Sequence, residues 1–417
     1  MKILIAVHGF PPREPGVWTI HHARELARRH SVWVYARTNH PSRPEFDQWE
    51  DRDGAVTVRR VVHQQLDPMR YFNGFQVPQI DERFLAFVDE IGPDVIHFEH
   101  LFGLSAGIVA GARARGVPTV LCLYDAWMIC QRVFLLRADG TPCAGPDPAF
   151  DCVTCIEGQW RRFPPDDGEM RLRLQLHDFR QATLRQAFEA ASVVTTCSQA
   201  LRESFAATWG LSQDRLRVVS LGVPPLAAPV IHVPSARVRI VYLGALAPHK
   251  GVHLLAEAAQ ALDDLEVEVR VHGAGAPSFL DRLRELYPRL SCRPPYARDE
   301  LPGILAHTDI LVLPSLAAET FSFVLREAAL ANVPVVASRI GAIPEYIRDG
   351  ETGLLFEPGN VADLARALRR LVLDPRLRAR LANAHGPVRS VEDYSGEMEQ
   401  IYRSLANEAA PSAGEIR

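Results

Sequence analysis

The feature that most constrains the fold is an alternation of apolar runs and amphipathic segments that begins twice. It begins at MKILIAVHGF (residues 1–10) and again at VRIVYLGAL (residues 238–246), and each run is followed by a loop and a segment with helical spacing. Alternating strands and helices of this kind predict parallel sheets covered by helices. The sequence therefore predicts an α/β protein with two Rossmann-like domains, in which ligands bind at the carboxyl ends of the strands.

The stretch VPPLAAPVIHVPSA separates the two starts and is rich in proline and small residues, as linkers often are. A chain of 417 residues is also long for a single core. We therefore expect several regions. They are a first domain at 1–222, a linker at 223–237, a second domain at 238–385, a helix at 386–408 that crosses back to the first domain, and a disordered tail at 409–417.

The composition indicates a globular protein, with 47% apolar and 23% charged residues. A net charge of −4 gives no reason to expect binding to nucleic acid. No apolar run approaches the roughly 18 residues of a membrane span, and ILIAV near the N-terminus is too short for a signal peptide. We expect a cytoplasmic protein, and the sequence does not exclude peripheral contact with a membrane or settle the oligomeric state.

A strand, a loop and a helix are predicted in DILVLPSLAAETFSFVLREAALANVPVV (residues 309–336). Glu319 lies in the loop, and Glu327 follows eight residues later. The unpaired N–H groups and positive dipole end of the helix start favour a phosphate. Two carboxylates so placed accept hydrogen bonds from two sets of sugar hydroxyls, although the bare spacing also fits a helix-start acid and a solvated residue. The helix is expected to start near Phe321, with Thr320 and Ser322 beside it.

Lysine is rare in this chain, since only Lys2 and Lys250 occur among 46 basic residues. A compact ammonium and a guanidinium are not equivalent at a phosphate site, so Lys250 is a candidate ligand, with chance retention as the alternative. It follows the strand that ends near Gly244, where the missing Cβ permits close approach of a ligand. A further glycine, Gly273, lies in HGAGA and is a weak signal alone.

Residues 127–170 are predicted to form an irregular insertion that contains a C-x2-C pair. Two more thiolates upstream would complete a closed, tetrahedral zinc site, which would tie down a loop of about 40 residues. Such a zinc is structural, because four thiolates leave no open position for catalysis. Disulfides, which a cytoplasmic location disfavours, and unlinked buried thiols are the alternatives. The cysteines are Cys130, Cys143, Cys152 and Cys155.

The segments GALAPHKG and PSLAAETFSFVLREAALANVPVV resemble the retaining nucleotide-sugar glycosyltransferases of family four, which have the GT-B fold. A subset of that family has a similar Cys-containing insertion. In the GT-B fold, two Rossmann-like domains face a cleft. The resemblance implies that Glu319 contacts the sugar of a UDP- or GDP-sugar donor, Glu327 its ribose and Lys250 its diphosphate. No aspartate motif for a divalent ion stands out, so we expect transfer without a metal cofactor.

Several positions depart from the pattern of that family. The family usually carries two adjacent glycines in the first loop, and only Gly16 matches, because Val17 occupies the second place. Ala245 stands where an arginine usually accompanies the lysine. Arg298 and Arg326 are candidates to compensate for that missing charge.

Two further residues follow the strand predicted at 118–123. Tyr124 replaces a histidine that lies near the transferred sugar in the family, and a phenol is no base at neutral pH. Asp125 keeps the family's place, and a substrate role and a loop-capping role are equally open for it. Retaining transfer needs no enzymic base there, so the resemblance still implies an active enzyme.

The predicted reaction is transfer of a sugar to a hydroxyl acceptor of unknown class, in carbohydrate or natural-product biosynthesis. Lys250, the N–H of Gly16 and the helix start at 321–322 would stabilise the leaving diphosphate as preorganised charge and dipoles. Glu319 would hold the sugar. One alternative is a GT-B phosphorylase or nucleotide-sugar epimerase, and another is a catalytically silent nucleotide-sugar-binding protein.

Overall fold

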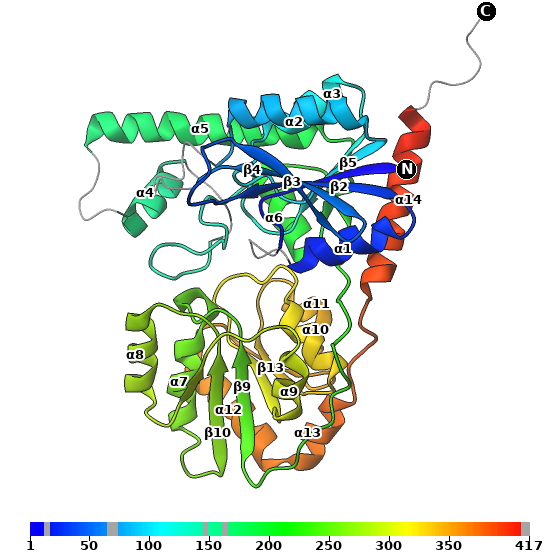
Figure 1. The fold of residues 1–417 in the computed structure, drawn as a ribbon. Helices are drawn as coiled ribbons and strands as arrows, with labels where there is room; N and C mark the ends of the chain where they lie inside the picture. Colours follow the sequence, from blue (N-terminus) through cyan, green and yellow to red (C-terminus); the bar gives the residue numbers. More distant parts are fainter. Residues whose placement is uncertain (12–16, 65–73, 144, 146–148, 161–165, 410–417) are drawn as a thin grey trace, which may run out of the picture.

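Two parallel sheets lie one above the other, each packed against helices (Figure 1). The computed structural model describes residues 1–11, 17–64, 74–143, 145, 149–160 and 166–409. The predicted α/β class with two Rossmann-like units is confirmed. Among the helices of these described residues, none is long and apolar enough to cross a membrane.

The first sheet has the strand order β3-β4-β2-β1-β5-β6-β7-β8, and β3 alone runs antiparallel to its neighbour. Its central strands are continuous apolar runs because helices cover both faces. The strands are β1 (Lys2–Val7), β2 (Ser31–Thr38), β3 (Gln48–Asp53), β4 (Val56–Val62), β5 (Val95–Phe98), β6 (Thr119–Leu123), β7 (Val193–Thr196) and β8 (Arg217–Val218). The helices are α1 (Val17–Ala27), α2 (Pro78–Ile91), α3 (Gly107–Ala114), α4 (Ala149–Trp160), α5 (Asp167–Ala190), α6 (Gln199–Trp209) and the 3-10 turn η1 (Gln213–Arg215).

The second sheet is parallel throughout, in the order β11-β10-β9-β12-β13-β14. The strands are β9 (Val238–Leu243), β10 (Val267–His272), β11 (Ser291–Arg293), β12 (Ile310–Leu313), β13 (Val335–Ser338) and β14 (Leu354–Phe356). The helices are η2 (Pro248–Lys250), α7 (Val252–Gln260), α8 (Pro277–Leu286), α9 (Leu301–Ala306), α10 (Phe323–Leu330), α11 (Ile343–Tyr346), α12 (Val361–Leu373) and α13 (Pro375–Ala382).

The insertion is more regular than its sequence predicted. It contains α4, and α5 begins inside it at Asp167, where the side chain of Asp166 accepts a hydrogen bond from Glu169 N at 2.8 Å. The start of the insertion is fixed by the fully buried Arg180 of α5. This guanidinium donates to the carbonyl oxygens of Trp127 and Met128.

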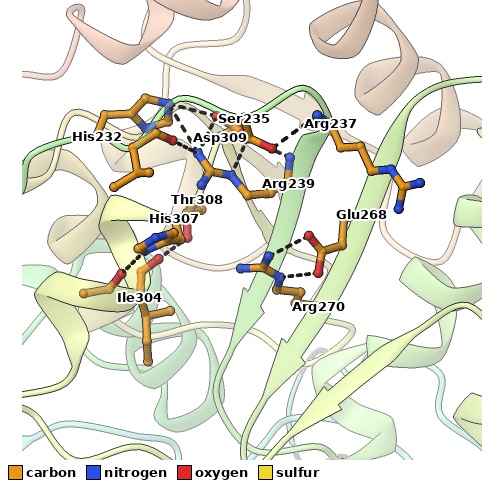
Figure 2. A network of polar contacts seen from close by, with 12 residues as sticks. His232, Ser235, Arg237, Arg239, Glu268, Arg270, Ile304, His307, Thr308 and Asp309 are labelled. Atoms are coloured by element: carbon orange, nitrogen blue, oxygen red, sulfur yellow. Dashed lines mark hydrogen bonds and ion pairs between the residues drawn. The ribbon is translucent and has the colours of Figure 1, made fainter.

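Residues 223–237 form neither helix nor strand. The segment starts beside a cavity at Pro224, and its later part is bound at the opposite end of the second sheet. Figure 2 shows the centre of this attachment, where the buried Arg239 of β9 pairs with Asp309 through Nε at 2.8 Å. The same guanidinium donates to Val233 O at 2.5 Å, and His232 lies 3.0 Å from Asp309. The connecting segment therefore moves with the second sheet.

The C-terminal helix α14 (Val391–Ala409) returns to the first sheet and packs against α1, as predicted (Figure 1). On its way the chain passes the end of the first sheet, where Val223 N donates to Arg389 O at 2.8 Å. Gly222 lies at this crossing, and a Cβ there would lie 1.9 Å from Ser390 O. The two connections between the sheets thus touch each other. The tail predicted at 409–417 lies, beyond Ala409, outside the described residues.

A buried polar network attaches α14 to the first sheet. Tyr402 of α14 reaches His97 Nδ1 at 2.5 Å and His22 Nε2 at 3.2 Å. Ser395, also on α14, lies 2.8 Å from His22 Nδ1. Burial lowers the pKa of both imidazoles, to about 3 for His97, so the rings are neutral and exchange hydrogen bonds with hydroxyls.

Glu99 lies fully buried beside this network. Thr19 Oγ1 donates to one carboxylate oxygen, and Oε1 has no partner among the described residues. Burial raises the pKa of Glu99 to about 8, so its carboxyl group is mostly protonated at pH 7. The titratable groups around it are His22 and His97, each with a ring nitrogen within 4.8 Å of a carboxylate oxygen, and Tyr124, Tyr394, Tyr402 and Cys122.

We expect Gly222→Ala to lower stability by about 1–3 kcal/mol, because the new methyl group overlaps the carbonyl of Ser390. The matched control is Gly396→Ala in α14, where a Cβ meets nothing within 4 Å. That change is expected to add about 1 kcal/mol through helix propensity. The calorimetric melting temperature should fall in Gly222→Ala and rise in Gly396→Ala. A Gly222→Ala protein that melts like the wild type would contradict the close contact between Gly222 and Ser390.

Glu99 is expected to make the protein less stable as the pH rises from about 5 to about 8. Over this range the unfolded carboxyl has lost its proton, at an ordinary pKa of 4.5, while the folded one keeps it, so each pH unit favours unfolding by about 1.4 kcal/mol. Glu99→Gln should remove this contribution. Melting temperatures at pH 5, 6.5 and 8 should diverge in favour of the variant, and parallel curves would show that Glu99 is ionised in the fold.

Candidate functional site

Two loops meet at the carboxyl ends of the adjacent strands β9 and β12. Leu316 N and Ala317 N, from the loop after β12, donate to His249 O at 3.0 and 3.1 Å. Gly251 has φ 68°, and a Cβ there would lie 1.8 Å from Pro314 O. The loops can pack this closely only because that position is glycine. Their backbones therefore form one rigid unit.

Lys250 and Glu319 face each other from these two loops. Lys250 Nζ lies 2.8 Å from Glu319 Oε1, and Ser315 Oγ donates to the same oxygen at 2.6 Å. The carboxylate is largely shielded and the ammonium is about one-third exposed. The two residues that the sequence singled out independently thus form one charged pair at the carboxyl edge of the second sheet.

The backbone of Glu319 is supported by the turn that begins at Gly341. Ala342 N donates to Glu319 O at 2.7 Å, and a Cβ on Gly341 would lie 2.3 Å from that same oxygen. The next helix, α11, carries Glu345, whose carboxylate accepts hydrogen bonds from two backbone N–H groups at the start of α6. Those donors are Gln199 N at 3.0 Å and Ala200 N at 2.7 Å, both from the first sheet's unit.

A cavity of about 430 Å³ lies over the ion pair and is lined from both units. It brings together most of the predicted donor residues, and it adds Trp18 and Tyr242, which sequence reasoning missed. Burial raises the pKa of Tyr242, whose hydroxyl donates to Ala245 O at 2.8 Å. The predicted residues that line the cavity are Tyr124, Gly244, Lys250, Glu319, Thr320, Phe321 and Ser322.

The helix after Glu319 begins two residues later than predicted. α10 starts at Phe323, because Ser322 has φ 58° and the chain is not yet helical there. The Ser322 side chain makes no capping hydrogen bond. Arg326 instead donates to the carbonyl oxygens of Phe321 and Ser322 and lies over the Phe321 ring. Thr320 to Ser322 therefore approach the cavity as loop residues.

Glu327 lines a second cavity of about 320 Å³, and Trp18 and Phe323 line both cavities. Glu327 Oε1 lies 2.7 Å from Arg298 Nη1. Glu319 and Glu327 therefore line two neighbouring cavities. Neither Arg298 nor Arg326 is among the residues that line the first cavity.

The remaining predicted residues have varied placements. Tyr124 lines the cavity, but its hydroxyl lies 3.0 Å from that of Tyr394 in α14. Asp125 caps its loop by accepting from Trp127 N at 2.8 Å. Burial acts to raise the pKa of Asp125, but His100 at 3.1 Å, the N–H of Trp127 and the charge of His8 together lower it.

Of the two other glycines predicted near the donor, Gly273 and Gly16, only Gly273 lies among the described residues. A Cβ at Gly273 would lie 1.7 Å from Gly244 O, so Gly273 is needed for backbone packing between neighbouring strand ends. It is not among the residues that line either cavity described above. Gly16 lies outside the described residues.

The four cysteines of the insertion line one cavity of about 30 Å³ together with His177. All four are free thiols. Among the described residues, one group of three potential metal ligands has its atoms within 4.8 Å of one another, and it is His22, His97 and Glu99. The imidazoles of that group already exchange hydrogen bonds with the hydroxyls under α14. The cysteine sulfurs share a cavity but are farther apart than a zinc site requires.

An aromatic contact connects the insertion to the lysine loop. Phe134 stacks on His249, with ring centroids 4.2 Å apart and planes inclined by 16°. Sequence reasoning missed both residues. His249 precedes Lys250 and could have been included by adjacency, but a contact across 115 positions leaves no local signal.

Comparison with known proteins extends these findings. Residues 16–225 match the family description "Glycosyltransferase Family 4", and residues 237–374 match "Glycosyl transferases group 1". A D-inositol 3-phosphate glycosyltransferase from Arthrobacter sp. is 26% identical over 370 residues, which cover 85% of this chain and 80% of the relative. The corresponding protein of Mycobacterium bovis is 27% identical over 433 residues, which cover 97% and 83%.

Solved structures share the whole fold. Sucrose-phosphate synthase from Thermosynechococcus elongatus superposes with a TM-score of 0.72 at 18% identity, covering 98% of this chain and 99% of the other. Anabaena HepE, in complex with UDP and glucose, gives 0.65 at 18% identity, covering 97% and 100%. These likenesses assign the GT-B fold. Because the first family match spans half of the 417 residues, the chain belongs to glycosyltransferase family 4.

Proposed function

We propose that this glycosyltransferase transfers a sugar from a nucleotide-diphosphate sugar to an acceptor hydroxyl, with retention of anomeric configuration. The observation that carries the proposal is the Lys250–Glu319 pair in a 430 Å³ cavity between the two sheets. The ammonium of Lys250 can pair with the oxygens of a diphosphate. The carboxylate of Glu319 can accept hydrogen bonds from sugar hydroxyls. HepE, which has the same fold, was solved with UDP and with UDP-glucose.

The two cavities suggest how the donor lies. Its sugar and diphosphate occupy the larger cavity, where Glu319 accepts from hydroxyls and Lys250 pairs with phosphate oxygens. Its ribose occupies the smaller cavity, beside Glu327. The segment 238–385 acts as the donor domain, and the segment 1–222 shapes the acceptor side.

The chemistry of the larger cavity supports retention. Glu319 is already held by Lys250 and Ser315, which suits a hydrogen-bond acceptor better than a nucleophile. The acceptor hydroxyl then attacks from the face that the diphosphate leaves, and the departing phosphate oxygen takes its proton. The hydroxyl of Tyr124 is hydrogen-bonded to that of Tyr394 and forms part of the cavity wall. No step requires it as a base.

We further propose that the four cysteines of the insertion hold a structural zinc, with their sulfurs drawn closer together than they lie in this structure. The support is that four free thiols line one small cavity, a donor set that suits zinc. Cys130, Cys143, Cys152 and Cys155 would hold the ion. It would tie α4 to the loop that follows β6, and it would take no part in transfer.

Lys250→Ala and Glu319→Gln are each expected to lower transfer about 100-fold or more, because each removes a preorganised charge from the reacting centre. The donor for the assay is the nucleotide sugar, among UDP-, GDP- and ADP-linked sugars, that raises the melting temperature of the wild type. The control is Glu285→Gln on the exposed surface of α8. Near wild-type rates in both variants, or no stabilising nucleotide sugar, would refute the proposed function.

We expect purified protein to contain about one zinc per chain, since zinc binds four-thiolate sites as a single ion. Replacing the C-x2-C pair, in Cys152→Ser with Cys155→Ser, should release the metal and lower the melting temperature. Cys292→Ser, outside the insertion, is the control and should retain the metal. Elemental analysis that finds well under one zinc in the wild type would refute this assignment.

A further inference from the structure

The larger cavity offers little net positive charge for a diphosphate. Among the described residues that line it, only Lys250 and Glu319 are charged, and they are paired with each other. A nucleoside diphosphate carries several negative charges, and a lysine already neutralised by a carboxylate compensates little of that charge. A cation from outside the lining is therefore needed.

Arg132 lines the cavity of the cysteine insertion rather than the larger one, and it belongs to the segment of the insertion that contacts the lysine loop. Phe134, two residues along, stacks on His249, the residue before Lys250. Burial, then the charges of Lys250 and Arg132, lower the pKa of His249 to about 4, and the charge of Glu319 opposes them. Both cations thus lie within electrostatic range of the same ring.

The Arg132 side chain is loosely held, unlike the other arginines near the site. Its Nη1 donates to Cys155 O at 3.5 Å, the long limit of a hydrogen bond, and its buried Nε has no partner among the described residues. Arg298 is engaged by Glu327 at 2.7 Å. Arg326 is engaged by backbone carbonyls and aromatic rings.

The backbone on both sides of Phe134 is strained, and this conformation sets the direction in which the Phe134 side chain points. Val133 has φ 75° and Leu135 has φ 49°, both in the left-handed region that a β-branched or bulky residue rarely adopts. Leu135 is buried, and its carbonyl accepts from Cys143 N at 2.9 Å. Strain of this kind persists where the surrounding structure holds it, often at a binding site.

We propose that Arg132 binds the diphosphate of the donor together with Lys250, so that the cysteine insertion forms a wall of the donor site. This inference rests on the proposed function, because it assumes that a nucleotide-diphosphate sugar enters the cavity. The diphosphate draws Arg132 away from its long contact with Cys155 and competes with Glu319 for the ammonium of Lys250.

The test compares the affinity of the full-length protein for nucleoside diphosphates and monophosphates by titration calorimetry. The probes are UDP with UMP, GDP with GMP and ADP with AMP, and the pair that binds the wild type is carried forward. Arg132→Gln should weaken diphosphate binding about tenfold and change monophosphate binding by less than about twofold, since a charge-assisted contact to the second phosphate is lost. Arg132→Lys should keep most of the affinity.

Arg137→Gln is the matched control, because Arg137 is an exposed arginine of the same loop. It should bind both probes as the wild type does. If Arg132→Gln binds the diphosphate normally while Lys250→Ala does not, the inference is wrong and the proposed function stands. Equal weakening of both probes would mean that Arg132 only shapes the loop, which also overturns the inference. A wild type that binds none of the diphosphates would overturn the proposed function itself.

Discussion

The structure depends on the contact between two loops that end neighbouring strands of the second sheet. Their backbones are joined through the carbonyl of His249, and their side chains meet in the pair between Lys250 and Glu319. An ion pair that is partly shielded from water interacts more strongly than an exposed one. The same shielding strengthens the interaction of each charged group with a ligand. The first sheet completes the cavity above this pair, so the pocket exists only when both units are in place.

Much of this arrangement follows from local patterns in the sequence. Apolar runs predict the buried strands, and parallel strands bring their carboxyl ends to one edge, which is why Lys250 and Glu319 could be singled out separately and then found together. The edge strand β3 escaped prediction because QWEDRD has no apolar pattern. The start of α10 was misplaced because the positive φ of Ser322 is set by its surroundings rather than by local propensity.

Contacts between distant residues are the part that the sequence could not predict. Tyr402 joins His97 across 305 positions, and Phe134 meets His249 from the other unit. The same holds for the regularity of the insertion, where α4 and the buried Arg180 give order to a segment whose own pattern is irregular. Such contacts depend on the relative positions of whole elements, which a local pattern does not encode.

Glu345 gives the two units a mechanical connection. Its carboxylate occupies the start of α6, while the turn just before it supports the backbone of Glu319. A rotation that separates the sheets must break this cap or pull on that turn. Opening the molecule therefore disturbs the Glu319 carboxylate directly, and an intact Lys250–Glu319 pair and a closed arrangement of the units become a single mechanical state.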